Sequence, residues 1–315
     1  MTAVDSTISE PQVQPARSIA HESAELTRIS TGVVAFNLAY LALAWLVALG
    51  AIAVFWIQPA WYTFALAFVV VSSRQQALLN CEHEAVHRKF LPDRRLNEWI
   101  GRYLTAAPVG SPFGAARARH LSHHQLLGRP EDPDRELHQG EDKETRRGLV
   151  RYFANALLGG YAGMILMGPR VKTEPAANSA RADLISLVVV QGALFAGLAL
   201  TTAWWVYPAL WLAPLASATA FCHLLRSFVE HAITESESEA HANRLITIRS
   251  NLLERAIVAP YNMNYHAEHH ILPAVPAPRL GELQHRLSAR PDAPAILVRP
   301  SYGAAIRRYL RELPR

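Results

Sequence analysis

Cysteine is scarce in this chain, with two among 315 residues. Cys81 and Cys222 both lie at or inside apolar segments. Two cysteines cannot supply a disulfide framework, so covalent cross-links do not define this fold. We expect both thiols to be buried and inert, because free cysteine behaves as a small apolar residue.

Charge is the second shortage, because several long stretches contain almost none. Hydrophobic residues make up 50% of the chain, and the mean hydropathy is above zero. Apolar runs of about 20 residues match the hydrocarbon thickness of a bilayer, and they lack the polar stripe that soluble helices keep. The sequence therefore predicts an all-α membrane protein with four transmembrane helices, at about 33–56, 60–80, 184–205 and 207–226.

Two short turns, Gln58-Pro59 and Tyr207-Pro208, join these spans into two hairpins. Neither turn contains Lys or Arg, whereas the segment from Arg88 to Lys172 is rich in both. Positive charge marks cytoplasmic loops, so both termini are expected in the cytoplasm. Tryptophans near the outer turns are expected to form a belt at the membrane interface: Trp56, Trp61, Trp204, Trp205 and Trp211.

The polar segments between and after the hairpins are expected to form a cytoplasmic helical cap. The predicted organisation is an N-terminal arm at 1–30, a membrane domain at 31–290 that includes cap segments 81–182 and 227–290, and a tail at 291–315.

Three further segments give more local expectations. The arm lacks the apolar core of a cleavable signal peptide. The loop 128–148 is charged and interrupted by proline, which predicts a solvated connection. The apolar segment 149–168 is expected to lie in the plane of the interface. A fifth span there would move the last group of histidines to the opposite side of the membrane.

The net charge of +5 is distributed over the predicted cytoplasmic segments. Anionic lipid headgroups or an acidic protein partner account for this distribution, so nucleic acid is not expected as a partner.

Histidine is the residue that the chain concentrates. Nine of its 14 histidines fall into four groups, all on the predicted cytoplasmic side. Residues three or four apart on a helix share a face, so the members of each group can converge on one ion. Nine imidazoles can fill the coordination spheres of two metal ions. The predicted ligands are His83, His87, His120, His123, His124, His231, His266, His269 and His270.

The first group offers an alternative, because His83-Glu84-Ala85-Val86-His87 also matches the His-Glu-x-x-His signature of zinc proteases. Glu84 would then be the general base of a membrane protease. A catalytic zinc needs only three protein ligands, which leaves six histidines unexplained. The chain also contains no Asp-Gly pair to supply a further acidic ligand.

The groups resemble the three histidine boxes of the membrane fatty acid desaturase superfamily. The boxes are His83-x-x-x-His87, His120-x-x-His123-His124 and His266-x-x-His269-His270. The segment from Asn264 to Pro273 is much like bacterial acyl desaturases, and Arg226-x-x-x-Glu230-His231 resembles the segment with that family's extra ligand. The resemblance covers roughly residues 33–290.

The resemblance implies a non-haem di-iron centre held by the nine histidines, with O2 as co-substrate. Imidazole also binds zinc, which can replace iron in a purified sample. It implies a fatty acyl or lipid substrate from the bilayer, and a multi-pass protein of the bacterial inner membrane whose active site faces the cytoplasm. Glu84, Glu230, Glu268 and Asn264 adjoin ligands and are candidates to accept hydrogen bonds from imidazole N–H groups.

Two features modify this implication. The three-residue spacing in the first box also occurs in hydroxylases and ketolases on the same scaffold, so hydroxylation stays open beside desaturation. The sequence has no cytochrome b5-like His-Pro-Gly-Gly and no four-cysteine ferredoxin pattern. Electrons are therefore expected from a separate ferredoxin, rubredoxin or cytochrome.

Overall fold

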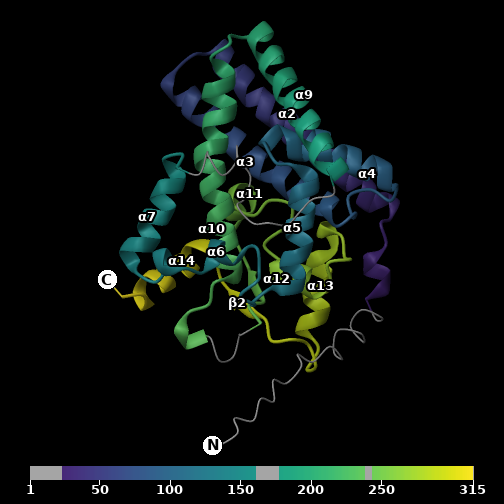
Figure 1. Cartoon of the computed structure of the whole chain (residues 1–315), viewed down its shortest axis with the longest axis vertical. Helices are drawn as coiled ribbons and strands as arrows, with labels where there is room; N and C mark the ends of the chain where they lie inside the picture. The colour runs from purple at the N-terminus through teal and green to yellow at the C-terminus, as the bar shows by residue number, and fades with distance from the viewer. Residues whose placement is uncertain (1–22, 161–176, 238–242, 315) are drawn as a thin grey trace, which may run out of the picture.

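Long helices form one half of the molecule, and shorter helices form a cap on the other half (Figure 1). The computed structural model describes residues 23–160, 177–237 and 243–314 of the chain. Most of the described residues are helical, which confirms the predicted helical character.

The first pair of long helices consists of α2 (Thr31–Ile57) and α3 (Trp61–Val86). The Ser30 hydroxyl caps α2 by accepting a hydrogen bond from the Val33 N–H. A short turn follows, in which the Thr63 hydroxyl accepts from the Ala60 N–H at 3.1 Å. At 1.5 Å per residue each helix is about 40 Å long, which exceeds a hydrocarbon core of about 30 Å.

The second pair begins with α9 (Ala177–Thr201). The helix after it has three segments, η5 (Pro208–Leu212), η6 (Leu215–Thr219) and α10 (Ala220–His231). The first two are π-helical and contain or follow a proline, which removes a backbone donor and disturbs the regular winding. The rings of Phe55 and Trp205 are 6.1 Å apart, so the connections after α2 and α9 lie side by side.

Three described helices are long and apolar enough to cross a membrane: Thr31–Ile57, Ser179–Thr201 and Pro208–His231. The second half of α3 is polar, and its side chains are buried against the rest of the protein. Gln75 donates to the Trp211 carbonyl at 2.8 Å, and Ser73 donates to the Ala256 carbonyl at 2.7 Å. The predicted span 60–80 is therefore helical, and its crossing of the membrane stays a prediction.

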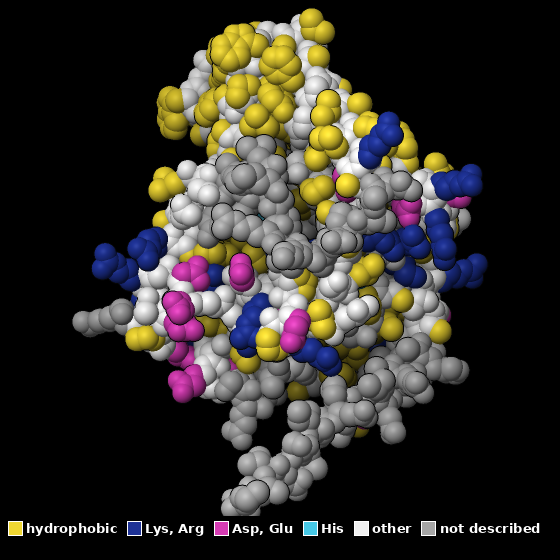
Figure 2. All heavy atoms as spheres, in the orientation of Figure 1, with side chains coloured by type: hydrophobic (Ala, Val, Ile, Leu, Met, Phe, Trp, Pro, Cys, Tyr) yellow, Lys and Arg dark blue, Asp and Glu magenta, His cyan; other side chains and the backbone are white. Residues whose placement is uncertain are grey.

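Apolar side chains are exposed around the outer ends of the long helices, whereas charged side chains gather around the cap (Figure 2). Trp61 is 83% exposed and Trp204 is 67% exposed, as an interfacial belt requires. The prediction is wrong for Trp211, which faces inward and is fully buried. Its indole N–H donates to the Pro108 carbonyl at 2.9 Å, and its ring stacks on Trp45.

The cap is built from two stretches of the chain. The first contributes α4 (Arg94–Ile100), η2 (Gly101–Ala106), η3 (Ala107–Val109), α5 (Phe113–Leu126), α6 (Arg135–His138), η4 (Glu141–Lys143) and α7 (Arg146–Leu157). The second contributes η7 (Glu235–Glu237), β1 (Ile246–Ile248), α11 (Leu252–Ile257), α12 (His266–Ile271), η8 (Ala277–Arg279), α13 (Leu280–Ser288), β2 (Leu297–Arg299) and α14 (Tyr302–Glu312).

A small parallel sheet corrects the all-α prediction. Strands β1 and β2 pair in parallel, with Thr247 opposite Val298. Each strand has three residues, which is too short to give a recognisable alternating pattern in the sequence. The sheet also brings the predicted tail into the fold, because α14 follows β2 directly and Tyr309 of α14 packs on Phe228 of α10.

The predicted interfacial segment 149–168 begins in α7, which has 12 residues and is too short to cross a bilayer. Leu149, Tyr152 and Phe153 are buried, whereas Leu158 just after the helix is 86% exposed. The rest of this segment, from residue 161, lies outside the described residues, as do residues 1–22 of the arm. The described part of the arm includes a short 3-10 helix, η1 (Ala24–Thr27).

Candidate metal centre

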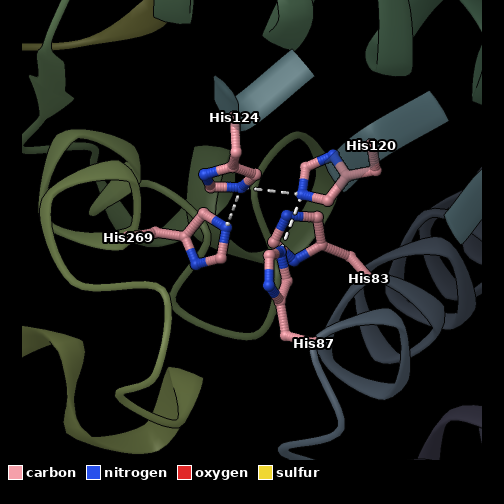
Figure 3. Close-up of side chains that lie close together, drawn as sticks. All are labelled: His83, His87, His120, His124 and His269. Atoms are coloured by element: carbon pink, nitrogen blue, oxygen red, sulfur yellow. Dashed lines mark hydrogen bonds between the residues drawn. The ribbon is translucent and has the colours of Figure 1, made fainter. Parts of the chain in front are cut away.

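All nine predicted ligands come together, and they form two clusters. The first cluster contains five imidazoles (Figure 3): His83, His87, His120, His124 and His269. The second contains four: His123, His231, His266 and His270. Within each cluster one ring nitrogen per residue lies within 4.8 Å of all the others. The rings of His124 and His270 stack at 4.2 Å between centroids, so the two clusters are neighbours.

Helix geometry divides two of the boxes between the clusters. In α5, His120 and His124 are four residues apart and belong to the first cluster, whereas His123 points to the second. In α12 the arrangement is reversed, because His266 and His270 belong to the second cluster and His269 to the first. Residues four apart share a helix face, and the intervening position is rotated from it. Each of these two boxes therefore contributes to both clusters.

The imidazoles face one another through Nε2. In the first cluster the Nε2 atoms of His87 and His120 are 2.8 Å apart, and those of His124 and His269 are 3.0 Å apart. In the second, His231 Nε2 lies 3.2 Å from His123 Nε2 and 2.9 Å from His266 Nε2. Lone pairs that converge in this way repel unless protons or a cation lie between them. The arrangement therefore fits a metal ion at the centre of each cluster.

The electrostatic setting keeps these rings in the form that binds metal. Burial, with nearby cations, lowers the pKa of His87 to about 3, and burial beside other imidazoles lowers the pKa of His124 to about 2. These two rings are therefore neutral at physiological pH, as ligation requires. His83 supports the same conclusion, because both of its ring nitrogens are buried without a hydrogen-bond partner among the described residues.

Two carboxylates lie near imidazoles of the second cluster, on the Nδ1 side of each ring. His123 Nδ1 lies 2.8 Å from an Asp132 oxygen, and His266 Nδ1 lies 3.4 Å from a Glu230 oxygen. Burial alone would raise the pKa of Asp132, but the hydrogen bond with the His123 ring brings it below its usual value. A carboxylate behind a ligand fixes the ring orientation and leaves Nε2 free for metal.

Asp132 was not among the predicted site residues. It lies in the loop 128–148, and the prediction that this loop is a solvated connection is wrong for Asp132, His138 and Lys143, which are all buried. The position of Asp132 eight residues after the second box was the available signal. Only the folded loop, however, shows that the chain turns back onto His123.

The other three candidate residues have backbone or hydroxyl partners. Glu84 accepts a hydrogen bond from the Ala277 N–H at 3.0 Å, and Asn264 donates to the Ile248 carbonyl at 2.9 Å. Glu268 accepts from the Thr247 hydroxyl at 2.5 Å. Burial raises the pKa of Glu268 to about 7. In these contacts the three side chains join the histidine-bearing helices to the surrounding cap.

A tenth histidine also lies close to the site. His138 is buried, and its ring centroid is 5.3 Å from that of His231. Neither of its ring nitrogens has a hydrogen-bond partner among the described residues. Burial lowers the pKa of His138 to about 3. It could not be singled out from the sequence, because no second histidine is near it in the chain.

A cavity of about 240 Å³ opens beside both clusters, between α3, α5 and α10. His83 and His120 of the first cluster contribute to its wall, as do His123, His231 and His266 of the second. A molecule in this cavity would therefore contact the ligands of both candidate metal positions.

Fold and site together define a helical protein with apolar helices of membrane-spanning length and two adjoining histidine clusters that could hold metal. The chain belongs to the fatty acid desaturase family, whose model matches residues 59–301. This match confirms the resemblance seen in the histidine boxes.

Among characterised proteins, the chain is similar to the dihydrorhizobitoxine desaturase of Bradyrhizobium elkanii. The two sequences are 25% identical over 239 residues, which cover 69% of this chain. The same match covers 65% of that protein, so the chain spans less than two thirds of the relative's length.

Proposed function

We propose that the protein is a membrane-embedded di-iron desaturase that introduces a carbon–carbon double bond with O2 as the oxidant. The observation that carries the proposal is the pair of adjoining clusters, in which nine imidazoles present ring nitrogens to two common centres. In the reaction two C–H bonds break and a second carbon–carbon bond forms. Two electrons from the substrate and two from an external carrier, with four protons, reduce O2 to two water molecules.

The ligands would be the five histidines of the first cluster for one iron and the four of the second for the other. Bound iron would supply O2 activation and the oxidising power for C–H cleavage. The chain's own residues hold the rings in place, through Asp132 behind His123 and Glu230 near His266. They also exclude water, because His123, His231, His266 and His269 are at most 4% exposed.

We further propose that the long helices, including α3, form four spans in two hairpins. The adjoining turns after α2 and α9, at the end away from the cap, support this arrangement. The cap and both termini would then face the cytoplasm of a bacterial inner membrane, where a separate ferredoxin, rubredoxin or cytochrome delivers electrons. A fatty acyl or lipid chain would be the substrate by analogy with the family.

The zinc-protease alternative finds no support in the site. His83 and His87 share their cluster with three further histidines, which would leave a zinc ion without an open position for water. Glu84 is held by the Ala277 N–H instead of lying free to act as a base. Hydroxylation stays as an outcome that the experiment below distinguishes.

The proposal is tested with protein purified without oxygen in the presence of ferrous iron. We expect two irons per chain in the wild type and fewer in His231→Ala. His285→Ala is the matched control, because His285 is an exposed histidine of α13. With an electron donor and O2, the product should be lighter than its substrate by two hydrogens. One zinc and no iron would contradict the proposal, and a product heavier by one oxygen would indicate a hydroxylase.

A further inference from the structure

Helix α7 lies lengthwise beside α10 and also contacts η6, the segment that precedes α10 (Figure 1). Its first residue, Arg146, donates to the Leu313 carbonyl at 2.8 Å, so α7 begins beside the end of α14 in the cap. Halfway along, the Phe153 ring lies 5.7 Å from the Phe228 ring and 5.8 Å from the Phe221 ring of α10. The two helices are therefore neighbours over much of the length of α7.

The other end of α7 reaches far along the last long helix. A Cβ atom added to Gly159 would lie 3.8 Å from the Ala216 carbonyl oxygen, so the chain just after α7 is close to η6. At 1.5 Å per residue, Ala216 is about 12 Å along the helix axis from Pro208, where η5 begins. A hydrocarbon core is about 30 Å thick. Since the last long helix is proposed to cross the membrane from Pro208, this end of α7 lies within the bilayer.

Charged and apolar side chains are separated along the axis of α7. The charged residues of the helix, which include Arg147 and Arg151, all lie in its first half. The sequence from 152 to 160 has no charged residue, and Leu157 and Leu158 there are 48% and 86% exposed. A helix in the plane of the interface separates polar from apolar side chains around its axis instead. Separation along the axis fits a helix that starts among headgroups and ends in hydrocarbon.

The backbone at the end of α7 is suited to an apolar surrounding. The N–H groups of Leu158, Gly159 and Gly160 donate to carbonyls in the last turn of the helix, at 3.0, 3.2 and 2.8 Å. Gly159 has a φ of +80°, a left-handed conformation that glycine adopts without strain and that closes many helix ends. Backbone groups in hydrocarbon have no water to bond with, so they must be satisfied within the protein. These three hydrogen bonds meet that requirement for the carbonyls that accept them.

We infer that α7 enters the bilayer from the cap and forms a lipid-contacting surface there. Phospholipid acyl chains contact Leu157 and Leu158, while Arg147 and Arg151 lie among the headgroups. This inference rests on the proposed span of the last long helix, and it differs from the in-plane orientation that the sequence predicts for this segment. Because Phe153 packs against α10, lipid meets α7 instead of this side of α10.

The orientation of α7 is tested with nitroxide labels on single introduced cysteines, in vesicles of phosphatidylethanolamine and phosphatidylglycerol. The native Cys81 and Cys222 are buried, so an introduced surface thiol reacts selectively. Collision of each label with O2, which concentrates in hydrocarbon, is compared with its collision with a water-soluble nickel chelate. The labelled positions are exposed and follow one face of α7 to its end: Arg147, Arg151, Ala154 and Leu158.

We expect the ratio of O2 collision to nickel collision to rise steadily from Arg147→Cys to Leu158→Cys. Equal ratios along this face would indicate a helix in the plane of the interface and would overturn the inference. A label at Leu158→Cys that neither reagent reaches would also overturn it, because another part of the protein would then cover this surface.

Two further labels separate this inference from the proposed spans. Val188→Cys lies on α9, where Val188 is 65% exposed, and it should give a ratio as high as that of Leu158→Cys. Glu282→Cys, at an exposed position of α13, is the aqueous control. Nickel access at Val188→Cys would contradict the spans themselves, whereas nickel access at Leu158→Cys alone would contradict only the insertion of α7. Elution of each labelled protein at the wild-type volume in detergent shows that it is folded.

Discussion

The two histidine clusters differ in how they are held. In the second cluster, His123 has Asp132 behind it and His266 has Glu230 close by. In the first cluster, among the residues that the structure describes, no carboxylate contacts an imidazole. Four of the five imidazoles there are only partly buried, whereas three of the four in the second are fully buried. Orientation and burial of the imidazoles thus favour metal binding in the second cluster, whereas an additional imidazole favours it in the first.

The largest effect is expected from removing a ligand of the four-histidine cluster. His231→Ala leaves that cluster with three imidazoles, so we expect one of two irons to be lost and activity to fall more than about 100-fold. Changes behind a ligand already cost about 10–100-fold. Iron content and product formation are the measurements, with His285→Ala as the control. Two bound irons in His231→Ala would contradict the assigned ligand set.

The corresponding change in the five-histidine cluster should be milder in metal content. His87→Ala leaves four imidazoles, the number that the second cluster has in the wild type. We expect it to retain two irons per chain and to lose activity, because the remaining rings no longer define the same geometry. Iron content measured side by side with His231→Ala decides the comparison. Equal iron loss in both variants would mean that the two clusters are not held differently.

A smaller effect is expected from changing the carboxylate that contacts an imidazole of the second cluster. Asp132→Asn keeps the shape of the side chain but removes the charge that His123 faces. We expect iron affinity to fall about 10–100-fold for one of the two ions, while the other is unchanged. Chelator titration of the iron-loaded protein measures both steps. Asp142→Asn is the control, because Asp142 lies in the same loop and pairs with Lys143, away from the imidazoles. If both steps of the titration are the same in Asp132→Asn and in the wild type, Asp132 does not support iron binding.

The smallest effect is expected from changing a residue that contacts Glu230 and no imidazole of the clusters. The Tyr302 hydroxyl of α14 donates to Glu230 at 2.7 Å, and Glu230 also accepts from Arg226. Tyr302→Phe removes one of these donors, so we expect the free energy of unfolding to fall by about 1 kcal/mol with two irons still bound. Denaturant unfolding in detergent measures this change, and Tyr62→Phe at an exposed position is the control. An identical unfolding midpoint for Tyr302→Phe and wild type would show that this contact does not support the site.

The sequence predicted which histidines come together better than it predicted their arrangement. Spacing of three and four residues identified His120, His123 and His124 as a unit, because helix periodicity is a local property. Spacing could not show that His123 belongs to a different cluster from His120 and His124, since that depends on the positions of α10 and α12 relative to α5. The contact of Asp132 with His123 and the burial of Trp211 also depend on tertiary packing, so they were not predicted.

The apolar helices were predicted correctly where hydropathy alone decides them, as in α2 and α9. Hydropathy was less informative for α3. Its polar side chains bond to partners that are far away in the sequence, such as the Ala256 carbonyl. The three-residue strands were also beyond the reach of a pattern, because β1 exists only where β2 pairs with it.

The polar half of α3 has a consequence for how the protein is made. A segment that carries Ser72, Ser73, Gln75 and Gln76 is a poor substrate for insertion into lipid by itself, because each exposed polar group would lose its hydrogen bonds with water. Its partners, the Trp211 carbonyl and the Thr219 hydroxyl, lie in a helix that is synthesised more than 100 residues later. If α3 spans the membrane as proposed, its insertion would therefore depend on the short turn to α2, and its polar contacts would be completed only after the last long helix is made.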